Sequence, residues 1–288
     1  MVGSTALLDC IVNAQLYNSE NVPIIPGGES SMCAEKTGAA TDPYDTTGSL
    51  SIALKWAIQH GSKKFALVYP NIGGLSFASL FDPMQAYITK TGAKTKFITL
   101  GVASNATAGD WDAAIATLKE DGVDTVAALA TANSEVVALS QANTNSFGPK
   151  NGIHWILGPS AYVPSIITPA LEGVYLLSWT YPWFTNAPGV KAALKLLKNV
   201  KNPDGVTALA YQDFSLFQSV LNEVKGPVTR QSILAAIRKN TPVQLSMSPY
   251  KVDLASLNNP EGGELLVLKN GKFQAASNYE TVKLPPGS

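Results

Sequence analysis

The chain has 288 residues, of which 45% are hydrophobic and 15% are charged, and its 21 basic residues balance 21 acidic ones. This length suits one large or two medium domains, and the hydrophobic content is that of a protein with a real core. Neutral net charge offers no basic patch to nucleic acid or to an anionic membrane, and no apolar run long enough to span a bilayer occurs in the sequence.

The first sixty residues predict short elements. Residues 1–5 are typical of a strand end that runs into a turn, and the apolar positions of residues 6–17 predict a helix. Residues 21–25 predict a short strand with a loop at its carboxyl end. A clean apolar spacing over residues 50–58 predicts a helix that Gly61 ends as its C′ residue.

The stretch from Ser62 to Pro159 alternates strands with helices and organises the chain. Short apolar runs without polar alternation predict buried strands at residues 65–69, 96–100, 125–129 and 153–157. One crossover helix is expected over Asp110–Glu120, with Asp110 as its N-cap and one apolar face made by Trp111, Ala114, Ile115 and Leu118. Such alternation predicts an α/β fold with a parallel sheet and right-handed crossovers.

The rest of the chain changes character. Residues 173–178 predict another buried strand, and the aromatic and proline-rich residues 179–188 indicate a crossing or hinge segment. Three helices are then expected in succession, at residues 190–200, 207–224 and 229–239. Asn270-Gly271 predicts a hairpin between strands at residues 264–269 and 272–276.

In open parallel sheets, ligands bind outside the carboxyl ends of the strands. Function is therefore expected in the segments Pro70–Gly74, Thr131–Ser134 and Gly158–Tyr162. An enzyme finds little support, because no metal-ligand spacing of histidines, nucleophile elbow, Walker A loop or dinucleotide-binding fingerprint occurs in the sequence. No cofactor is expected.

A series of segments resembles the substrate-binding proteins of branched-chain-amino-acid-type ABC importers, which have the type I periplasmic binding fold. The matching segments are Gly3–Thr5, Asn21–Pro26, Gly61–Tyr69, Thr91–Ala93, Asp112–Leu118, Gly122–Val126, Ile156–Pro159 and Gly173–Tyr175. The resemblance implies two α/β lobes with a small molecule held between them and buried by hinge closure. It places residues 1–48 and 178–258 in the first lobe, and 49–177 and 259–288 in the second.

The resemblance also sets expectations about the start of the chain and its surroundings. The family normally has further strand–helix units and an export signal before the position of Gly3. This sequence does not contain them, so a truncated first lobe is expected. The protein is expected in the periplasm or at the cell surface, as a monomer that a membrane permease recognises, with no nucleic acid partner. A ligand-sensing domain of the same fold, in a receptor or an amide-responsive regulator, is the alternative.

Candidate ligand residues follow from the strand ends and the resemblance together. Each of these residues either contacts the ligand or has a structural role. The structural alternatives are a helix cap for the hydroxyl residues, a solvated turn for the loop residues and core packing for the tyrosines. The full set is Ser4, Thr5, Gly28, Glu29, Ser30, Tyr69, Asn71, Thr131, Asn133, Ser160, Tyr162 and Tyr211.

Two further points concern ligand type and cysteines. Amino-acid binders of the family use carboxylates near the positions of Ser160 and Thr46, so an amide, a small carboxylate or another neutral polar molecule fits about as well as an amino acid. Cys10 and Cys33 are expected near one sheet edge, where they either form a disulfide, as the resemblance to exported proteins favours, or remain free thiols.

Overall fold

The computed structural model describes residues 2–4, 9–26, 46–72, 78–162, 167–201, 203–239, 242–254 and 261–282. The chain divides into two compact units. The first unit comprises Met1–Gly48, Trp179–Gly262 and Thr281–Lys283, and the second comprises Ser49–Ser178, Gly263–Glu280 and Leu284–Ser288.

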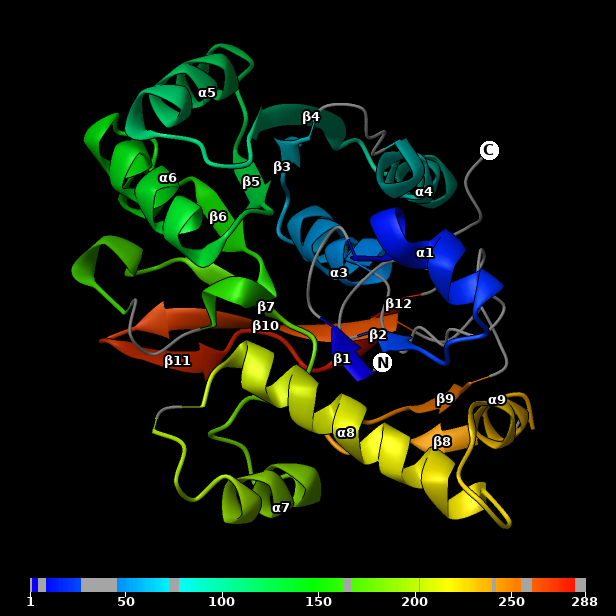
Figure 1. The fold of residues 1–288 in the computed structure, drawn as a ribbon. Helices are drawn as coiled ribbons and strands as arrows, with labels where there is room; N and C mark the ends of the chain where they lie inside the picture. Colours follow the sequence, from blue (N-terminus) through cyan, green and yellow to red (C-terminus); the bar gives the residue numbers. More distant parts are fainter. Residues whose placement is uncertain are drawn as a thin grey trace. The chain divides into compact units, whose positions relative to one another are not determined.

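The second unit is built on the predicted parallel sheet (Figure 1). Its strands are β3 (Lys64–Asn71), β4 (Lys96–Ala103), β5 (Thr125–Ala128), β6 (His154–Leu157), β7 (Tyr175–Ser178), β10 (Glu261–Lys269), β11 (Lys272–Ala275) and β12 (Glu280–Val282). They are ordered β11-β10-β7-β6-β5-β3-β4, and β12 pairs with β10. Neighbours from β4 to β7 are parallel, whereas β10 is antiparallel to β7 and β11.

Helices cover both faces of this sheet, which explains why its central strands carry no polar alternation. The helices are α3 (Thr46–Gln59), α4 (Ala78–Thr91), α5 (Ala108–Glu120) and α6 (Ala132–Thr144), with short 3-10 turns at η1 (Pro149–Asn151), η2 (Pro159–Ala161) and η4 (Pro169–Leu171). In Figure 1, α5 and α6 lie on one face, and α3 and α4 lie on the other. Every residue of β5 is buried, as expected of a central strand in a parallel sheet.

The helix α5 confirms the predicted apolar face, because Trp111, Ala114, Ile115 and Leu118 are all buried. The predicted cap is wrong by three residues. Thr107 is the N-cap, and its side chain accepts a hydrogen bond from the backbone N–H of Asp110, while the carboxylate of Asp110 accepts one from the backbone of Thr107. Asp110 is therefore the third helical residue of a capping box.

Two turns follow directly from their glycines. Asn270 and Gly271 have φ of +53° and +67°, the left-handed pair that a tight two-residue hairpin requires, so the predicted hairpin between β10 and β11 is confirmed. Gly61 has φ of +79° after α3 and ends that helix as predicted.

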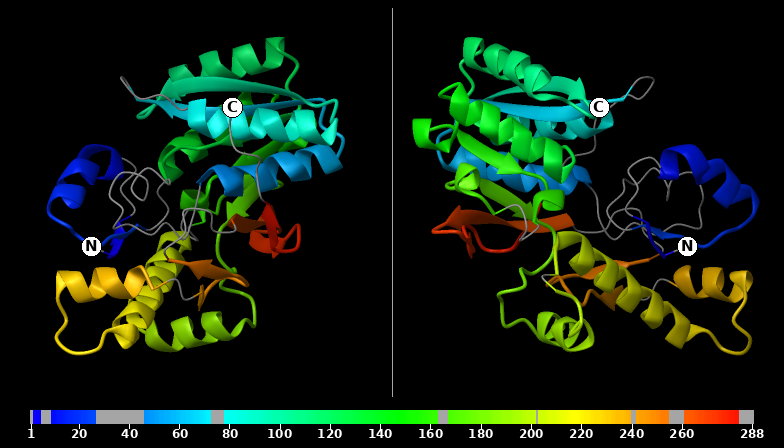
Figure 2. Two further views of the ribbon diagram at one scale, coloured as in Figure 1. Left: turned by 90° about the vertical axis from the view of Figure 1, so that its right-hand side faces the viewer. Right: turned by 60° about the vertical axis from the view of Figure 1, so that its left-hand side comes forward.

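The first unit contains the three successive helices that the sequence predicts, and α8 is its longest described element. Its helices and strands are β1 (Val2–Ser4), α1 (Asp9–Ser19), β2 (Ile25–Pro26), α7 (Pro188–Leu196), α8 (Gly205–Glu223), α9 (Arg230–Ile237), β8 (Pro242–Gln244) and β9 (Lys251–Asp253). The strands β1 and β2 pair in parallel, and α8 packs against both of them and against α9. Both views in Figure 2 show α7 beside α8.

The antiparallel pair β8–β9 was not predicted from the sequence. Its strands have only three residues each, which is too short for a period-2 pattern to be distinguished from a loop. Among the described helices, none combines the length and the apolar character needed to cross a membrane.

Candidate functional site

The order of the strands singles out one edge of the second unit's sheet. From β3 the chain passes to β4 on one side, and β5 then pairs with the other side of β3. This reversal is a topological switch point, and ligands bind outside the carboxyl ends of the strands at such points. Asn71 ends β3, and the segment after β5 leads through Thr131 into α6, so both belong to this carboxyl-end edge.

At the end of β3, Tyr69 is fixed by packing. Its ring lies 4.8 Å from that of Phe81 on α4, centroid to centroid. On the neighbouring strand β4, a Cβ on Gly101 would come within 3.4 Å of the Tyr69 ring and 3.2 Å of the Asn71 Cβ. A larger residue than glycine at position 101 would therefore crowd both side chains. Asn71 is exposed, so its side-chain amide is accessible at the carboxyl-end edge of the sheet.

At the end of β5, the structure gives Thr131 a capping role. Its side chain accepts a hydrogen bond from the backbone N–H of Ser134 at 3.4 Å, as the N-cap of α6. The hydroxyl of Ser134 in turn accepts a bond from the Trp111 indole at 3.1 Å, which ties α6 to α5. Asn133 lies in the first turn of α6 and is exposed.

Glu135 is a residue of this edge that the sequence analysis missed. Its Oε1 accepts hydrogen bonds from the backbone N–H groups of Ala130 at 3.0 Å and Gly158 at 3.3 Å, and so joins the segments after β5 and β6. Its Oε2 is buried and has no hydrogen-bond partner. Burial raises the pKa of the Glu135 carboxyl well above its usual value, because the charged form loses its hydration.

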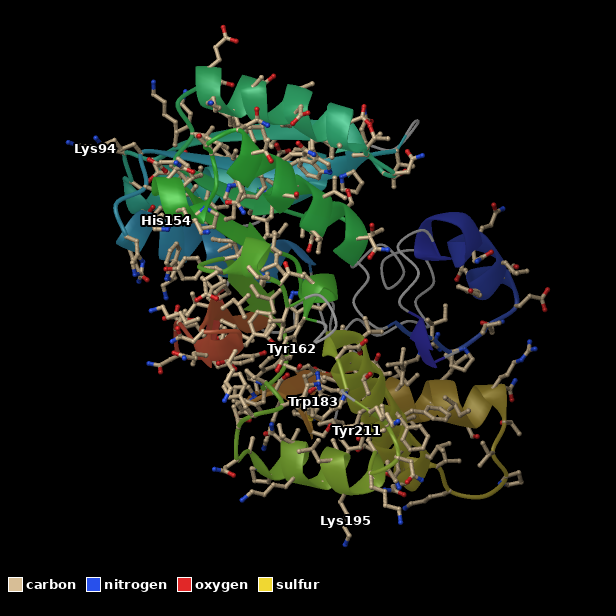
Figure 3. The ribbon with its side chains drawn as sticks, turned by 90° about the vertical axis from the view of Figure 1, so that its left-hand side faces the viewer. Lys94, His154, Tyr162, Trp183, Lys195 and Tyr211 are labelled. Atoms are coloured by element: carbon tan, nitrogen blue, oxygen red, sulfur yellow. The ribbon has the colours of Figure 1, made fainter. Side chains whose placement is uncertain are left out.

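At the end of β6, the chain enters the 3-10 turn η2. Ser160 lies in η2, and its side chain is outside the described residues. Tyr162 is buried, and its ring meets that of Phe273 on β11 edge-on, with centroids 5.4 Å apart (Figure 3). The turn η2 lies against both α6 and β7. The Tyr162 ring is therefore buried in the core between η2 and β11.

A second missed acid stands at the end of β7. Glu264 on β10 is paired in register with Ser178, the last residue of β7, and only 6% of Glu264 is exposed. Burial raises the pKa of its carboxyl to about 7. The sequence analysis placed Glu264 at the start of a strand, but β10 begins earlier and brings this residue to the carboxyl-end edge.

The first unit contributes fewer described site residues. Ser4 ends β1, but its side chain and that of Cys10 on α1 are not described. The expectations for Thr5, Gly28, Glu29, Ser30 and Cys33 also lie outside the described residues.

Tyr211 packs against a buried cluster of Val190, Ala193, Ala208 and Met247, together with Tyr181 and Trp183. Figure 3 shows Tyr211 and Trp183 close together. The indole of Trp183 donates a hydrogen bond to the backbone oxygen of Asp204 at 2.9 Å. Tyr181 and Trp183 of the aromatic segment after β7 thus pack inside the first unit.

The chain's two histidines lie away from the carboxyl-end edge. His154 begins β6, and its ring lies 5.2 Å from that of Trp56, against which His60 stacks at 4.1 Å. Among the described residues, no three histidine, cysteine, aspartate or glutamate side chains are grouped as a metal site would require.

The chain thus has two α/β units, and polar groups lie at the strand-end edge of the second. A model of the periplasmic binding protein family matches residues 1–260, and the chain belongs to this family. A search of curated proteins gives no match.

Solved structures share the fold at low sequence identity. A leucine binding protein from Thermotoga maritima matches with a TM-score of 0.75 and 16% identity over 93% of this chain and 76% of its own. A solute binding protein of an ABC transporter from R. palustris, in complex with 4-hydroxybenzoate, matches with a TM-score of 0.77 and 18% identity. The match covers 96% of this chain and 76% of that protein. A fatty acid ABC transporter substrate-binding protein from Thermomonospora curvata matches with a TM-score of 0.78 and 16% identity. The match covers 94% of this chain and 72% of that protein. These likenesses show the type I periplasmic binding fold.

Proposed function

We propose that this protein is the extracytoplasmic solute-binding component of an ABC importer. It binds a small polar molecule, namely an amino acid, an amide or a small carboxylate, and does no chemistry on it. One observation supports the proposal: β3 and β5 end at the switch point of the sheet, where ligands bind in parallel sheets, and Asn71 and Asn133 are exposed beside these ends.

The similar solved structures support the class of ligand. By their descriptions they bind leucine, 4-hydroxybenzoate or fatty acid, all of which carry a carboxylate. In this proposal the first unit contributes Ser4 and Thr5, with Gly28, Glu29 and Ser30, and a membrane permease receives the loaded protein. The protein acts as a monomer.

A thermal-shift panel tests the proposal, because a ligand that binds only the folded state raises the melting temperature. The purified protein is screened with amino acids, their amides, and aliphatic and aromatic carboxylates. At least one class is expected to stabilise it in a concentration-dependent way. An Asn71→Ala variant is expected to melt like the wild type without ligand and to lose part of the shift, because Asn71 is exposed. A panel with no response from any class would contradict the proposal.

A further inference from the structure

Charges in the second unit are divided between the two edges of its sheet. Its lysines are Lys55, Lys63, Lys64, Lys90, Lys94, Lys96, Lys119, Lys150, Lys269 and Lys272. They lie in the later turns of helices, just before or at the start of the parallel strands, and beside the hairpin turn of β10–β11. Apart from that of Lys55, which pairs with Glu280 on β12, these places belong to the amino-end edge, which Lys94 and His154 mark in Figure 3. In the described part of the unit, no lysine or arginine follows the end of a parallel strand before the next helix or 3-10 turn.

The carboxyl-end edge holds acids instead, and two of them are buried. Asp110 belongs to the capping box of α5, and Asp112 accepts a hydrogen bond from the side chain of Asn145 at 2.8 Å. Acids in the first turn of a helix are common, because they offset the positive end of its dipole. Glu135 and Glu264 differ, since both residues are buried, Glu135 Oε2 has no hydrogen-bond partner, and burial raises the pKa of Glu264.

Strand register places Glu264 on a definite face of the sheet. Side chains alternate along a strand, so Glu264 shares its face with Leu266 and Leu268. Phe273 pairs with Leu268 across β11 and therefore lies on the same face, where Tyr162 packs on it. Glu264 thus stands at the end of the strand face that η2 and Tyr162 cover.

Nothing in the described chain compensates the Glu264 carboxylate. It forms no hydrogen bond or ion pair there, although the four residues that follow it on β10 are buried and apolar. A buried carboxylate without a partner is costly. Such groups are concentrated at functional sites.

The charged or titratable side chains on the strands paired with β10 do not supply a partner. Tyr175 on β7 pairs with Val267, and Lys272 on β11 pairs with Lys269 at the far end of the strand. Glu280 on β12 is held by Lys55 at 2.5 Å. On η2 and the residue after it, Tyr162 packs on Phe273.

We infer that Glu264 makes this edge the receptor for a hydrogen-bond donor on the ligand, an ammonium, amide N–H or hydroxyl group, and thereby selects ligands that carry one. Glu135 assists by holding the segments after β5 and β6 together. The inference rests on the proposed function and adds the ligand group that the second unit recognises.

Two ligand pairs that differ by one donor test the inference. Leucine is compared with 4-methylpentanoate, which lacks its ammonium, and 4-hydroxybenzoate is compared with benzoate, which lacks its hydroxyl. Calorimetric titration is expected to show that the wild type binds the donor-bearing member of at least one pair tenfold or more tightly. Glu264→Gln is expected to reduce this ratio to about threefold or less, since a neutral amide is a weaker acceptor than a carboxylate. Glu120→Gln makes the same change at an exposed residue of the amino-end edge, and it is expected to leave the affinity ratio within each ligand pair unchanged.

A pH series on the wild type gives a second readout that needs no variant. An ammonium binds the ionised carboxylate, and a group with a pKa of about 7 is roughly one-tenth ionised at pH 6 and nine-tenths at pH 8. Leucine affinity is therefore expected to rise about tenfold from pH 6 to pH 8 in the wild type and to stay flat in Glu264→Gln.

The outcomes separate the two claims. Equal affinities within each pair, or a donor preference that Glu264→Gln leaves unchanged, would overturn the inference while the binding function stands. No binding of these four compounds, together with a silent thermal-shift panel, would overturn the proposed function and the inference with it.

Discussion

The two edges of the second unit's sheet treat buried polar groups differently. At the amino-end edge, the carboxylate of Asp124 accepts hydrogen bonds from the Ser62 hydroxyl at 2.5 Å and from the backbone N–H groups of Lys63 and Lys64 at 2.7 and 3.3 Å. At the carboxyl-end edge, Glu135 Oε2 is buried without a hydrogen-bond partner, and burial raises the pKa of the Glu264 carboxyl to about 7. A buried atom without a partner also occurs before β7, at Thr168 Oγ1, so an unpaired atom points to a ligand only where it lies at the edge that binds ligands in parallel sheets.

The largest expected effect concerns stability at the amino-end edge. Asp124→Ala removes the acceptor for two backbone N–H groups and for the hydroxyls of Ser62 and Thr125, and we expect the free energy of unfolding to fall by about 2–3 kcal/mol. Urea denaturation measures the loss, and Asp124→Asn, which keeps one acceptor oxygen, should lose less. Ligand affinity of the folded protein should stay within about twofold. A large loss of affinity would mean that the two edges are not independent.

A smaller loss is expected where the carboxyl-end edge is tightly packed. A Cβ on Gly158 would lie 3.1 Å from Glu135 Oε1, so Gly158→Ala must displace the carboxyl that joins two segments. We expect a loss of about 1–2 kcal/mol in the free energy of unfolding, with weaker ligand binding. The control is Gly109→Ala on α5, where a Cβ meets only Thr107 Oγ1 at 3.9 Å, and which should be neutral or stabilising. Equal effects at both glycines would remove the special role given to Glu135.

These two variants also show what the sequence could and could not predict. Apolar runs without alternation correctly indicated the strands β3, β5, β6 and β7, since a strand buried on both faces leaves that pattern directly in the residues. The expectation of a buried strand at residues 96–100 is wrong, because β4 is the edge strand of the sheet and Val102 is its one buried residue. Asn71, Thr131 and Tyr162 could be assigned to strand ends by counting along the chain. Glu264 could not, because its role depends on which residue of β7 it faces, and register is a property of the assembled sheet.

Glu135 was missed for a related reason. An acid near the start of α6 is ordinary in a sequence, because it suits the helix dipole. Only the fold shows that it reaches Gly158, which follows a different strand, and that one of its oxygens remains unpaired. Asp213 on α8 is a similar case in the first unit, since burial raises the pKa of its carboxyl and both its oxygens lack a hydrogen-bond partner.

The third prediction is a pH dependence at the carboxyl-end edge. The folded-state pKa of Glu135 lies above its unfolded value, so folding favours the protonated form. Its contribution is therefore fully present below the unfolded pKa of about 4.5 and is lost as the pH rises toward the folded pKa. Glu135→Gln, which cannot ionise, should show a flatter stability profile above pH 5 than the wild type. Parallel profiles in chemical denaturation would show that Glu135 is not held protonated.

The smallest expected effect has the opposite sign and belongs to the amino-end edge. Burial lowers the pKa of His154, so the folded state disfavours its protonation and stability falls as the pH drops through about 6.5. His154→Phe should remove this loss below pH 6. Fluorescence of Trp56, whose ring lies 5.2 Å from His154, provides a local probe of the titration in the wild type. A His154→Phe profile identical to the wild type would contradict the assignment.

The most direct test of the central claim is a map of backbone amide shifts on adding the strongest ligand of the thermal-shift panel to isotope-labelled protein. We expect the largest changes in the second unit at Asn71, Asn133, Gly158, Tyr162 and Glu264, and no comparable changes near Asp124 and His154. Saturable binding with its largest changes at the amino-end edge, and none at the ends of β3, β5 and β6, would contradict the account.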